Sequence, residues 1–208
     1  LLDELGVDIG PLPTRYNIAP TEPALTVFHD DEVGYNVGDM RWWLTPSWSA
    51  GPSQKYAMFN ARAESIDSSR AYRGPFRHHR AVIPATSFIE WQKRGSKKQP
   101  YEIKPTEGCF LFAAIWDVWT DGDALLYSCS MVTTAAVDSF THIHHRQPLM
   151  LSMETARQWL DPRQETHVLR SLLKSSLPAE LQVLPISAEI NNARTKCEPQ
   201  TIELDEDR

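Results

Sequence analysis

Short runs of apolar residues, several of them alternating with polar ones, fill the first two-thirds of this chain. Turn-rich pieces such as Arg94-Gly95-Ser96 separate the runs. Runs this short, bounded by turn residues, are typical of β-strands rather than helices. The predicted strands cover residues 24–28, 81–85, 87–91, 101–103, 109–116 and 125–133. We therefore expect a mostly antiparallel sheet in this part of the chain.

Helical periodicity appears later in the chain, where Ser152 is placed to cap a helix before an apolar-periodic stretch. The predicted helices cover residues 64–72, 153–160 and 165–174, and a last strand covers 182–186. No internal repeat or long linker interrupts the pattern. The sequence therefore predicts one α+β domain over residues 1–208, built on a curved sheet or barrel and ending in an acidic tail at 199–208.

The composition excludes several classes of protein. Of the 208 residues, 41% are hydrophobic and 23% are charged, which is ordinary for a globular chain and rules out disorder over its whole length. No apolar run approaches the roughly 20 residues that a membrane helix needs. The cysteines are widely spaced, at 109, 129 and 197, which favours reduced thiols in the cytoplasm. The chain opens on Leu1, and we expect further residues ahead of it.

The charge of the chain bears on nucleic acid as a partner. A formal net charge of −6 argues against a surface that is basic throughout. The charge is uneven, however, because the segment from Arg70 to Lys98 holds eight basic residues and one acid, Glu90. Residues 1–35, by contrast, hold seven acids and one arginine. Such a basic segment is either a solvated face or the footprint of a phosphate backbone.

Residues 59–64, Phe-Asn-Ala-Arg-Ala-Glu, bring an amide, a guanidinium and a carboxylate together just ahead of the basic segment. Arginine can bind a phosphate through two hydrogen bonds, and asparagine can both donate and accept. The alternative is structural, with Asn60 in a turn and Arg62 paired with Glu64.

Glu90 falls inside a predicted strand. Alternation places it on one face with Phe88 and opposite Trp91. Burial of a carboxylate among apolar residues is costly and raises its pKa. Glu90 is therefore either solvated or retained for catalysis.

Residues 141–148, Thr-His-Ile-His-His-Arg-Gln-Pro, concentrate histidine beside an arginine. In an extended segment His142 and His144 share one face, a spacing that allows zinc binding or acid–base work. Zinc usually needs a third protein ligand, and the sequence has no partner motif. We therefore expect no metal and no other cofactor. We favour a single histidine as general acid or base, with Arg146 holding an anion.

Three tryptophans lie in residues 41–48, Arg-Trp-Trp-Leu-Thr-Pro-Ser-Trp. Tryptophans in such a run are most often core or lid residues. One that faces the basic segment would offer a platform on which an unpaired base can stack.

Several of these segments occur in the order typical of one family. They are RYNIAP (15–20), RWWLTPSW (41–48), FNARAES (59–65), RAVIPATSFIEW (80–91), VTTAA (132–136), IHHRQP (143–148), and PIS with INN in 185–192. Together they resemble the SOS response-associated peptidase (SRAP) family of abasic-site processing proteins over about residues 15–192. The resemblance implies a curved antiparallel or mixed sheet that closes into a barrel-like core, with helices packed outside.

Members of that family bind single-stranded DNA and form a covalent thiazolidine with the aldehyde of a ring-opened abasic site. They use an N-terminal cysteine, which would lie ahead of Leu1 here. The resemblance implies that Asn60 orients the reactive terminus and that Glu90 and His144 move protons. It assigns phosphate binding to Arg62, Arg70, Arg80 and Arg146, stacking to Trp48, and the lining of the same groove to Pro20 and Thr133.

The partner implied by the resemblance is single-stranded DNA with abasic sites. The lack of a long apolar run leads us to expect no membrane partner. The protein is expected to be a monomer in the cytoplasm, associated with the nucleoid when bound to DNA. Two other functions stay open. One is a protease limited to removing its own N-terminal residue or a short propeptide, and the other is a non-catalytic module that binds single-stranded DNA.

Overall fold

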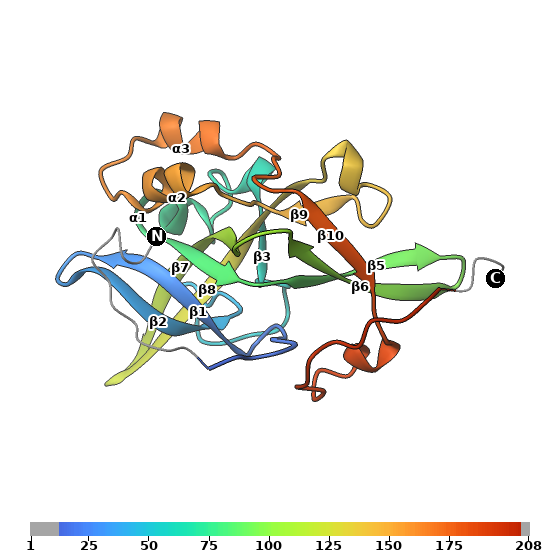
Figure 1. Cartoon of the computed structure of the whole chain (residues 1–208). Coiled ribbons are helices and arrows are strands. Elements are labelled where there is room, and N and C mark those ends of the chain that lie inside the picture. Colours follow the sequence, from blue (N-terminus) through green and yellow to red (C-terminus); the bar gives the residue numbers. More distant parts are fainter. Residues whose placement is uncertain (1–12, 205–208) are drawn as a thin grey trace.

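The computed structural model of this chain describes residues 13–204, and its centre is a closed ring of strands (Figure 1). The order around the ring is β2 (Gly34–Trp42), β1 (Pro23–Asp30), β4 (Arg80–Ala85), β7 (Phe110–Asp121) and β8 (Ala124–Ala135). The ring closes because β2 also pairs with β8. That pairing is parallel and the other four are antiparallel. The predicted barrel-like core of mixed sheet is therefore confirmed.

Two short strands extend the barrel sheet along β8. The first, β3 (Asn60–Arg62), is parallel to β8, and the second, β9 (Arg146–Pro148), is antiparallel to it. Thr133 on β8 is the register partner of Arg62 in β3 and of Pro148 in β9. Segments far apart in the sequence thus meet at one strand.

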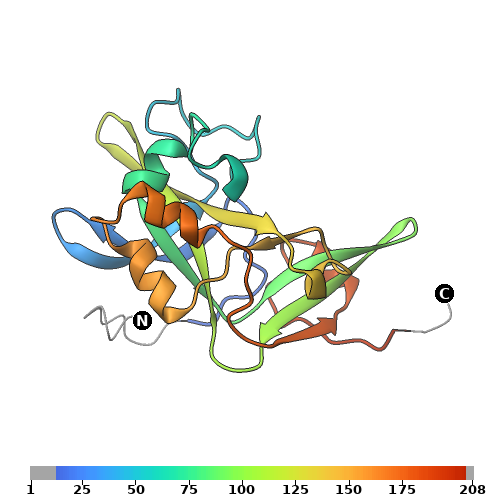
Figure 2. The same cartoon turned by 90° about the horizontal axis from the view of Figure 1, so that it is seen from above.

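A second sheet lies beside the barrel. It contains β5 (Phe88–Arg94), β6 (Lys97–Pro105) and β10 (Leu181–Pro185), in the order β10-β6-β5. The β5–β6 hairpin turns at Gly95, whose φ of +58° is readily adopted by glycine. It projects at the end of the molecule opposite the helices (Figures 1 and 2).

Aromatic packing fastens the second sheet to the barrel. The ring of Phe88, at the start of β5, lies 5.5 Å from that of Phe110 and 6.0 Å from that of Phe140. Stacks and edge contacts at such distances stabilise aromatic clusters. They fix the start of β5 and so the position of Glu90, two residues further along the same strand.

The three α-helices pack outside the barrel (Figure 2). They are α1 (Arg73–His78), α2 (Met153–Leu160) and α3 (Thr166–Leu172). As predicted, Ser152 caps α2 by accepting a hydrogen bond of 3.2 Å from the backbone N–H of Thr155. Trp159 of α2 is fully buried against β4 and donates its indole N–H to the carbonyl of Ala81. None of the helices within residues 13–204 has the length and apolar character of a membrane span.

The structure corrects two sequence predictions. The helix expected at 64–72 is limited to the 3₁₀ turn η2 (Ala63–Ser65), followed by turns in which Ser68 donates its hydroxyl to the carbonyl of Ser65. Serine side chains compete with helical backbone bonds in this way. The extended conformation considered for His142 and His144 is also absent, because this segment is a turn that follows η3 (Asp138–Phe140).

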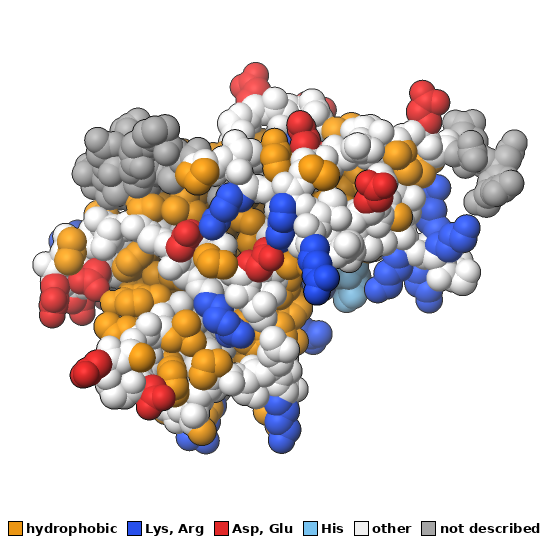
Figure 3. All heavy atoms as spheres, turned by 90° about the horizontal axis from the view of Figure 1, so that it is seen from below, with side chains coloured by type: hydrophobic (Ala, Val, Ile, Leu, Met, Phe, Trp, Pro, Cys, Tyr) orange, Lys and Arg blue, Asp and Glu red, His pale blue; other side chains and the backbone are white. Residues whose placement is uncertain are grey.

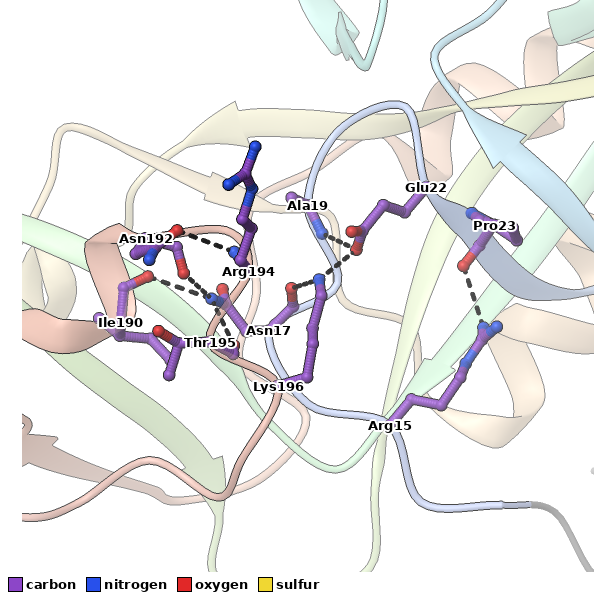
Figure 4. Close-up of polar contacts among 10 residues, drawn as sticks. All are labelled: Arg15, Asn17, Ala19, Glu22, Pro23, Ile190, Asn192, Arg194, Thr195 and Lys196. Atoms are coloured by element: carbon purple, nitrogen blue, oxygen red, sulfur yellow. Dashed lines mark hydrogen bonds and ion pairs between the residues drawn. The ribbon is translucent and has the colours of Figure 1, made fainter.

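The start of the described chain is fastened to its last segment (Figure 4). The side-chain amide of Asn17 donates to the carbonyls of Ile190, Asn192 and Thr195 at 3.1–3.2 Å. Lys196 Nζ donates to the carbonyl of Asn17 at 2.8 Å. These bonds hold the turn that carries Pro20 against η4 (Ala188–Asn191) and the residues after it. The acidic residues at 3, 4 and 8, and positions 205–208 of the predicted tail, lie outside the described residues.

Candidate functional site

Glu90 and His144 approach each other from different elements. Nδ1 of His144, in the turn ahead of β9, lies 3.7 Å from Oε1 of Glu90 on β5. The Glu90 side chain is only 23% exposed, so it is not the freely solvated carboxylate of the structural alternative. Burial raises the pKa of Glu90, and the positive charge available on His144 partly opposes that rise. A carboxyl and an imidazole so placed can exchange protons with a bound group.

His144 has backbone partners for both of its protonation states. Nδ1 lies 3.1 Å from the carbonyl oxygen of Arg146 and 3.3 Å from its backbone nitrogen. A protonated Nδ1 can donate to that carbonyl, whereas an unprotonated Nδ1 can accept from that N–H. The ring is therefore held in place whichever of its two nitrogens carries a proton.

A cavity of about 670 Å³ opens beside this pair. Its lining includes Glu90, Trp91, Lys93, Lys98, His144, His145 and Asn191. The indole N–H of Trp91 donates to Oδ1 of Asn191 at 2.7 Å, which fixes that amide and leaves its NH₂ end toward other acceptors. The two lysines make the cavity attractive to anions. Within residues 13–204 no group of three or more His, Cys, Asp or Glu side chains is arranged to hold a metal ion.

Five of the seven lining residues were not among the predicted site residues: Trp91, Lys93, Lys98, His145 and Asn191. Lys93 and Lys98 could have been found from the basic segment combined with a hairpin at Gly95, which places them directly opposite each other. Asn191 comes from the far end of the chain and reaches the cavity only through tertiary packing.

Arg146 is held by Glu64 and Thr133. Its guanidinium donates to both Glu64 oxygens, at 2.5 Å and 3.1 Å, and to the carbonyl of Thr133 at 2.6 Å. Hydrogen bonding to Arg146 holds the pKa of Glu64 below its ordinary value. Glu64 therefore pairs with Arg146, not with Arg62 as in the structural alternative. The bidentate bond fixes the plane of the guanidinium beside β8.

Asn60 and Arg62 lie on β3, and both are exposed while Ala61 between them is buried. Asn60 is thus part of a strand, and the structural alternative that places it in a turn is wrong. Because successive side chains of a strand alternate, Asn60 and Arg62 share one face.

Trp48 and Arg70 form a stacked pair at the surface. Cζ of Arg70 lies 4.2 Å from the centre of the Trp48 ring, and Trp48 is 54% exposed. The other two tryptophans of the 41–48 run are half-buried, and their indole N–H groups donate to backbone carbonyls. Trp48 is therefore the one of the three that offers a stacking surface.

Arg80 has a different place from the one expected. It is only 3% exposed, and its guanidinium donates to the carbonyls of Trp159 and Asp161, both at 2.7 Å, and to those of Phe76 and Arg77. Burial lowers the pKa of Arg80 to about 10. The prediction that Arg80 binds phosphate is wrong for this structure. Its buried guanidinium binds backbone carbonyls of α1 and of the end of α2 instead.

The structure thus brings the predicted residues together in pairs: Glu90 with His144, Arg146 with Thr133, and Trp48 with Arg70. Asn60 and Arg62 share β3, beside Thr133 on β8. Pro20 is half-buried in its own turn. The three cysteines are free thiols, and burial raises the pKa of Cys129 to about 12.

Solved structures share this barrel. A protein from Bacteroides thetaiotaomicron superposes with a TM-score of 0.72 at 28% sequence identity, over 81% of this chain and 75% of that one. The class is therefore that of small closed mixed barrels with a second sheet at one side. Within it the chain belongs to the SOS response associated peptidase (SRAP) family, whose family model matches residues 4–193.

Relatives that carry the name abasic site processing protein include two bacterial ones. YoqW of Bacillus subtilis is 32% identical over 192 residues, which are 90% of this chain and 85% of that protein. YedK of Escherichia coli is 36% identical over 152 residues, which are 73% of this chain and 65% of that protein.

Proposed function

We propose that this protein processes abasic sites in single-stranded DNA by joining itself covalently to them. The observation that carries the proposal is the Glu90–His144 pair beside a cavity lined by lysines. The names of the relatives and the SRAP family model support the abasic-site part of this proposal. The nucleophile is an N-terminal cysteine, which the proposal places ahead of Leu1.

The reaction needs one group that donates a proton and one that accepts a proton, both close to the aldehyde carbon of the sugar. The α-amine of the cysteine attacks the aldehyde carbon of the ring-opened sugar and gives a carbinolamine. Loss of its hydroxyl as water, after protonation, leaves an imine. The thiol sulfur then adds to the imine carbon and its proton passes to the nitrogen, which closes a thiazolidine. The whole sequence releases one water and needs no oxidant or cofactor.

Glu90 is suited to the proton-donating step. Because burial raises its pKa, it holds a proton to a higher pH than an exposed carboxyl. We assign it to protonation of the sugar ring oxygen and of the departing hydroxyl. His144, 3.7 Å away, takes the proton from the attacking amine and returns it.

The remaining predicted residues hold the strand. We assign a base stacked on Trp48 beside Arg70, and phosphates at Arg62, Arg70 and Arg146. Glu64 already binds the guanidinium of Arg146 and orients it. A phosphate would therefore bind an arginine whose position is fixed by the protein. We place Asn60 at the reactive terminus, with Thr133 and Pro20 along the same groove.

The test uses the full-length protein with its encoded N-terminus. A single-stranded oligonucleotide with one abasic site should give a product that survives denaturing electrophoresis. The same oligonucleotide with a tetrahydrofuran analogue, which cannot open to an aldehyde, should not. Tight binding without a covalent product, from protein shown to start at cysteine, would overturn the proposal in favour of the non-catalytic module. Cleavage of unrelated peptides at useful rates would favour the protease.

A further inference from the structure

The tip of the β5–β6 hairpin carries four cations in two facing pairs. Lys93 of β5 lies directly opposite Lys98 of β6, and Arg94 lies opposite Lys97. All four residues are exposed. Figure 3 shows Lys and Arg side chains gathered at the end of the molecule where this hairpin lies.

This arrangement is unfavourable for the isolated hairpin. Like charges directly opposite each other on neighbouring strands repel and destabilise the pair. Among the side chains of residues 13–204, no carboxylate forms an ion pair with any of the four; Arg94 Nε donates to the neutral amide of Gln92 instead. The repulsion is relieved when a polyanion binds, because each cation then faces a phosphate.

The cationic tip is continuous with the candidate site. Lys93 and Lys98 line the same cavity as Glu90 and His144. Arg94 and Lys97 are the next pair along the hairpin. Arg94 stands four strand residues beyond Glu90, or about 13 Å. A backbone that enters the cavity at the reacting sugar can therefore continue along the hairpin.

We propose that the tip formed by Lys93, Arg94, Lys97 and Lys98 is a second DNA-backbone site, which binds phosphates of nucleotides flanking the reacting one on one side only. This inference rests on the proposed function for the choice of DNA as the polyanion. It adds contacts to the DNA on one side of the reacting nucleotide. The site residues predicted from the sequence do not supply these contacts, because none of them lies on the tip.

The variant that tests it is Arg94→Gln/Lys97→Gln, which removes the two cations that do not line the cavity. The matched control is Arg163→Gln/Lys174→Gln, which removes the same charge beside α2 and α3 at the opposite end of the molecule (Figure 1). Binding is measured by fluorescence anisotropy with an undamaged single-stranded oligonucleotide over a range of salt concentrations. We expect the hairpin variant to bind on the order of tenfold more weakly at low salt, with a salt slope smaller by about 1.4. The control should keep the wild-type slope.

A second experiment locates the flank. Oligonucleotides that carry the tetrahydrofuran analogue are shortened from the 5′ side or from the 3′ side, and wild type and hairpin variant are compared on each. The difference between the two proteins should vanish when one particular flank is removed and persist when the other is removed.

The two proposals fail in different ways. Equal affinities and salt slopes for the hairpin variant and wild type would overturn the inference, even if wild type forms the covalent adduct. The cations of the tip would then serve only to prevent association of the exposed hairpin. A difference that survives trimming of either flank would overturn its one-sided character. Loss of affinity in the variant, combined with no adduct in wild type, would support the tip and contradict the proposed function.

Discussion

Nδ1 of His144 lies 3.7 Å from Oε1 of Glu90, a separation beyond direct hydrogen bonding but close enough for each charge to influence the other. The two groups therefore do not bond to each other, and Nδ1 is held by the backbone of Arg146 instead. This is the geometry expected for two groups that hand protons to a substrate rather than to each other.

Replacement of His144 should slow the chemistry. We expect His144→Ala to lower the rate of adduct formation at saturating DNA by about 10²–10⁴-fold, the usual contribution of a general acid or base. His167→Ala, on the exposed face of α3, is the matched control. The measurement is a quench-flow time course resolved by denaturing gel. Equal rates for the two variants would remove His144 from the mechanism.

Replacement of Glu90 should stabilise the fold at high pH. Because burial raises the pKa of Glu90, the folded state binds its proton more tightly than the unfolded chain, and stability falls as pH rises between the two pKa values. Glu90→Gln should therefore melt a few degrees higher than wild type at pH 8, with little difference at pH 4. Differential scanning calorimetry at both pH values checks this.

Glu64 should behave in the opposite sense. Hydrogen bonding to Arg146 lowers its pKa, so its ionised form stabilises the fold above the unfolded pKa, and that stability is lost as pH falls through the folded pKa. Glu64→Gln should lower the melting temperature at pH 8, by a few degrees at most because the pair is partly exposed. If Glu64→Gln and Glu90→Gln shift it in the same direction, one of the two assignments is wrong.

Replacement of Arg80 should damage the fold rather than DNA binding. Arg80→Ala leaves the carbonyl of Trp159 without its donor inside the protein, whereas the carbonyl of Asp161 keeps the backbone N–H of Gln164. The expected cost is roughly 3 kcal/mol. The melting temperature should fall by roughly 6–12 °C. The salt slope of binding, measured below that temperature, should stay at the wild-type value. A reduced salt slope with an unchanged melting temperature would show that Arg80 binds DNA phosphates after all.

Removal of the exposed indole should weaken binding without this loss of stability. Trp48→Ala should cost about 1–3 kcal/mol of single-strand affinity, the usual worth of one stacked base. Trp48→Phe should recover part of it because a smaller ring can still stack. Equal losses in the two variants would indicate that Trp48 acts through its contact with Arg70 rather than through a base.

The sequence was most informative where a residue's neighbours along the chain determine its environment. The runs at 109–116 and 125–133 form strands β7 and β8 because most of their apolar side chains face the core. The capped helix at 153–160 has the predicted bounds. The strand β2 went unpredicted because glycines interrupt its apolar pattern, yet it is the strand that closes the barrel.

The site could be predicted only in part, because tertiary packing determines which side chains contact each other. Glu90 and His144 were found as chemically capable residues, but nothing in their spacing shows that they meet. Arg80 looks like any other cation of the basic segment, and its burial depends on carbonyls at the end of α2. For the same reason Glu64 was matched to its sequence neighbour Arg62 rather than to Arg146.

The intact mass of the product formed by full-length protein and an abasic oligonucleotide is the measurement that most directly tests covalent capture. A thiazolidine predicts the sum of the two masses less one water, unchanged by borohydride treatment, with the oligonucleotide attached to the N-terminal residue. A product that gains two hydrogens with borohydride would be an imine and would contradict ring closure by the thiol. No covalent species at all, from protein that begins with cysteine, would contradict the proposed function itself.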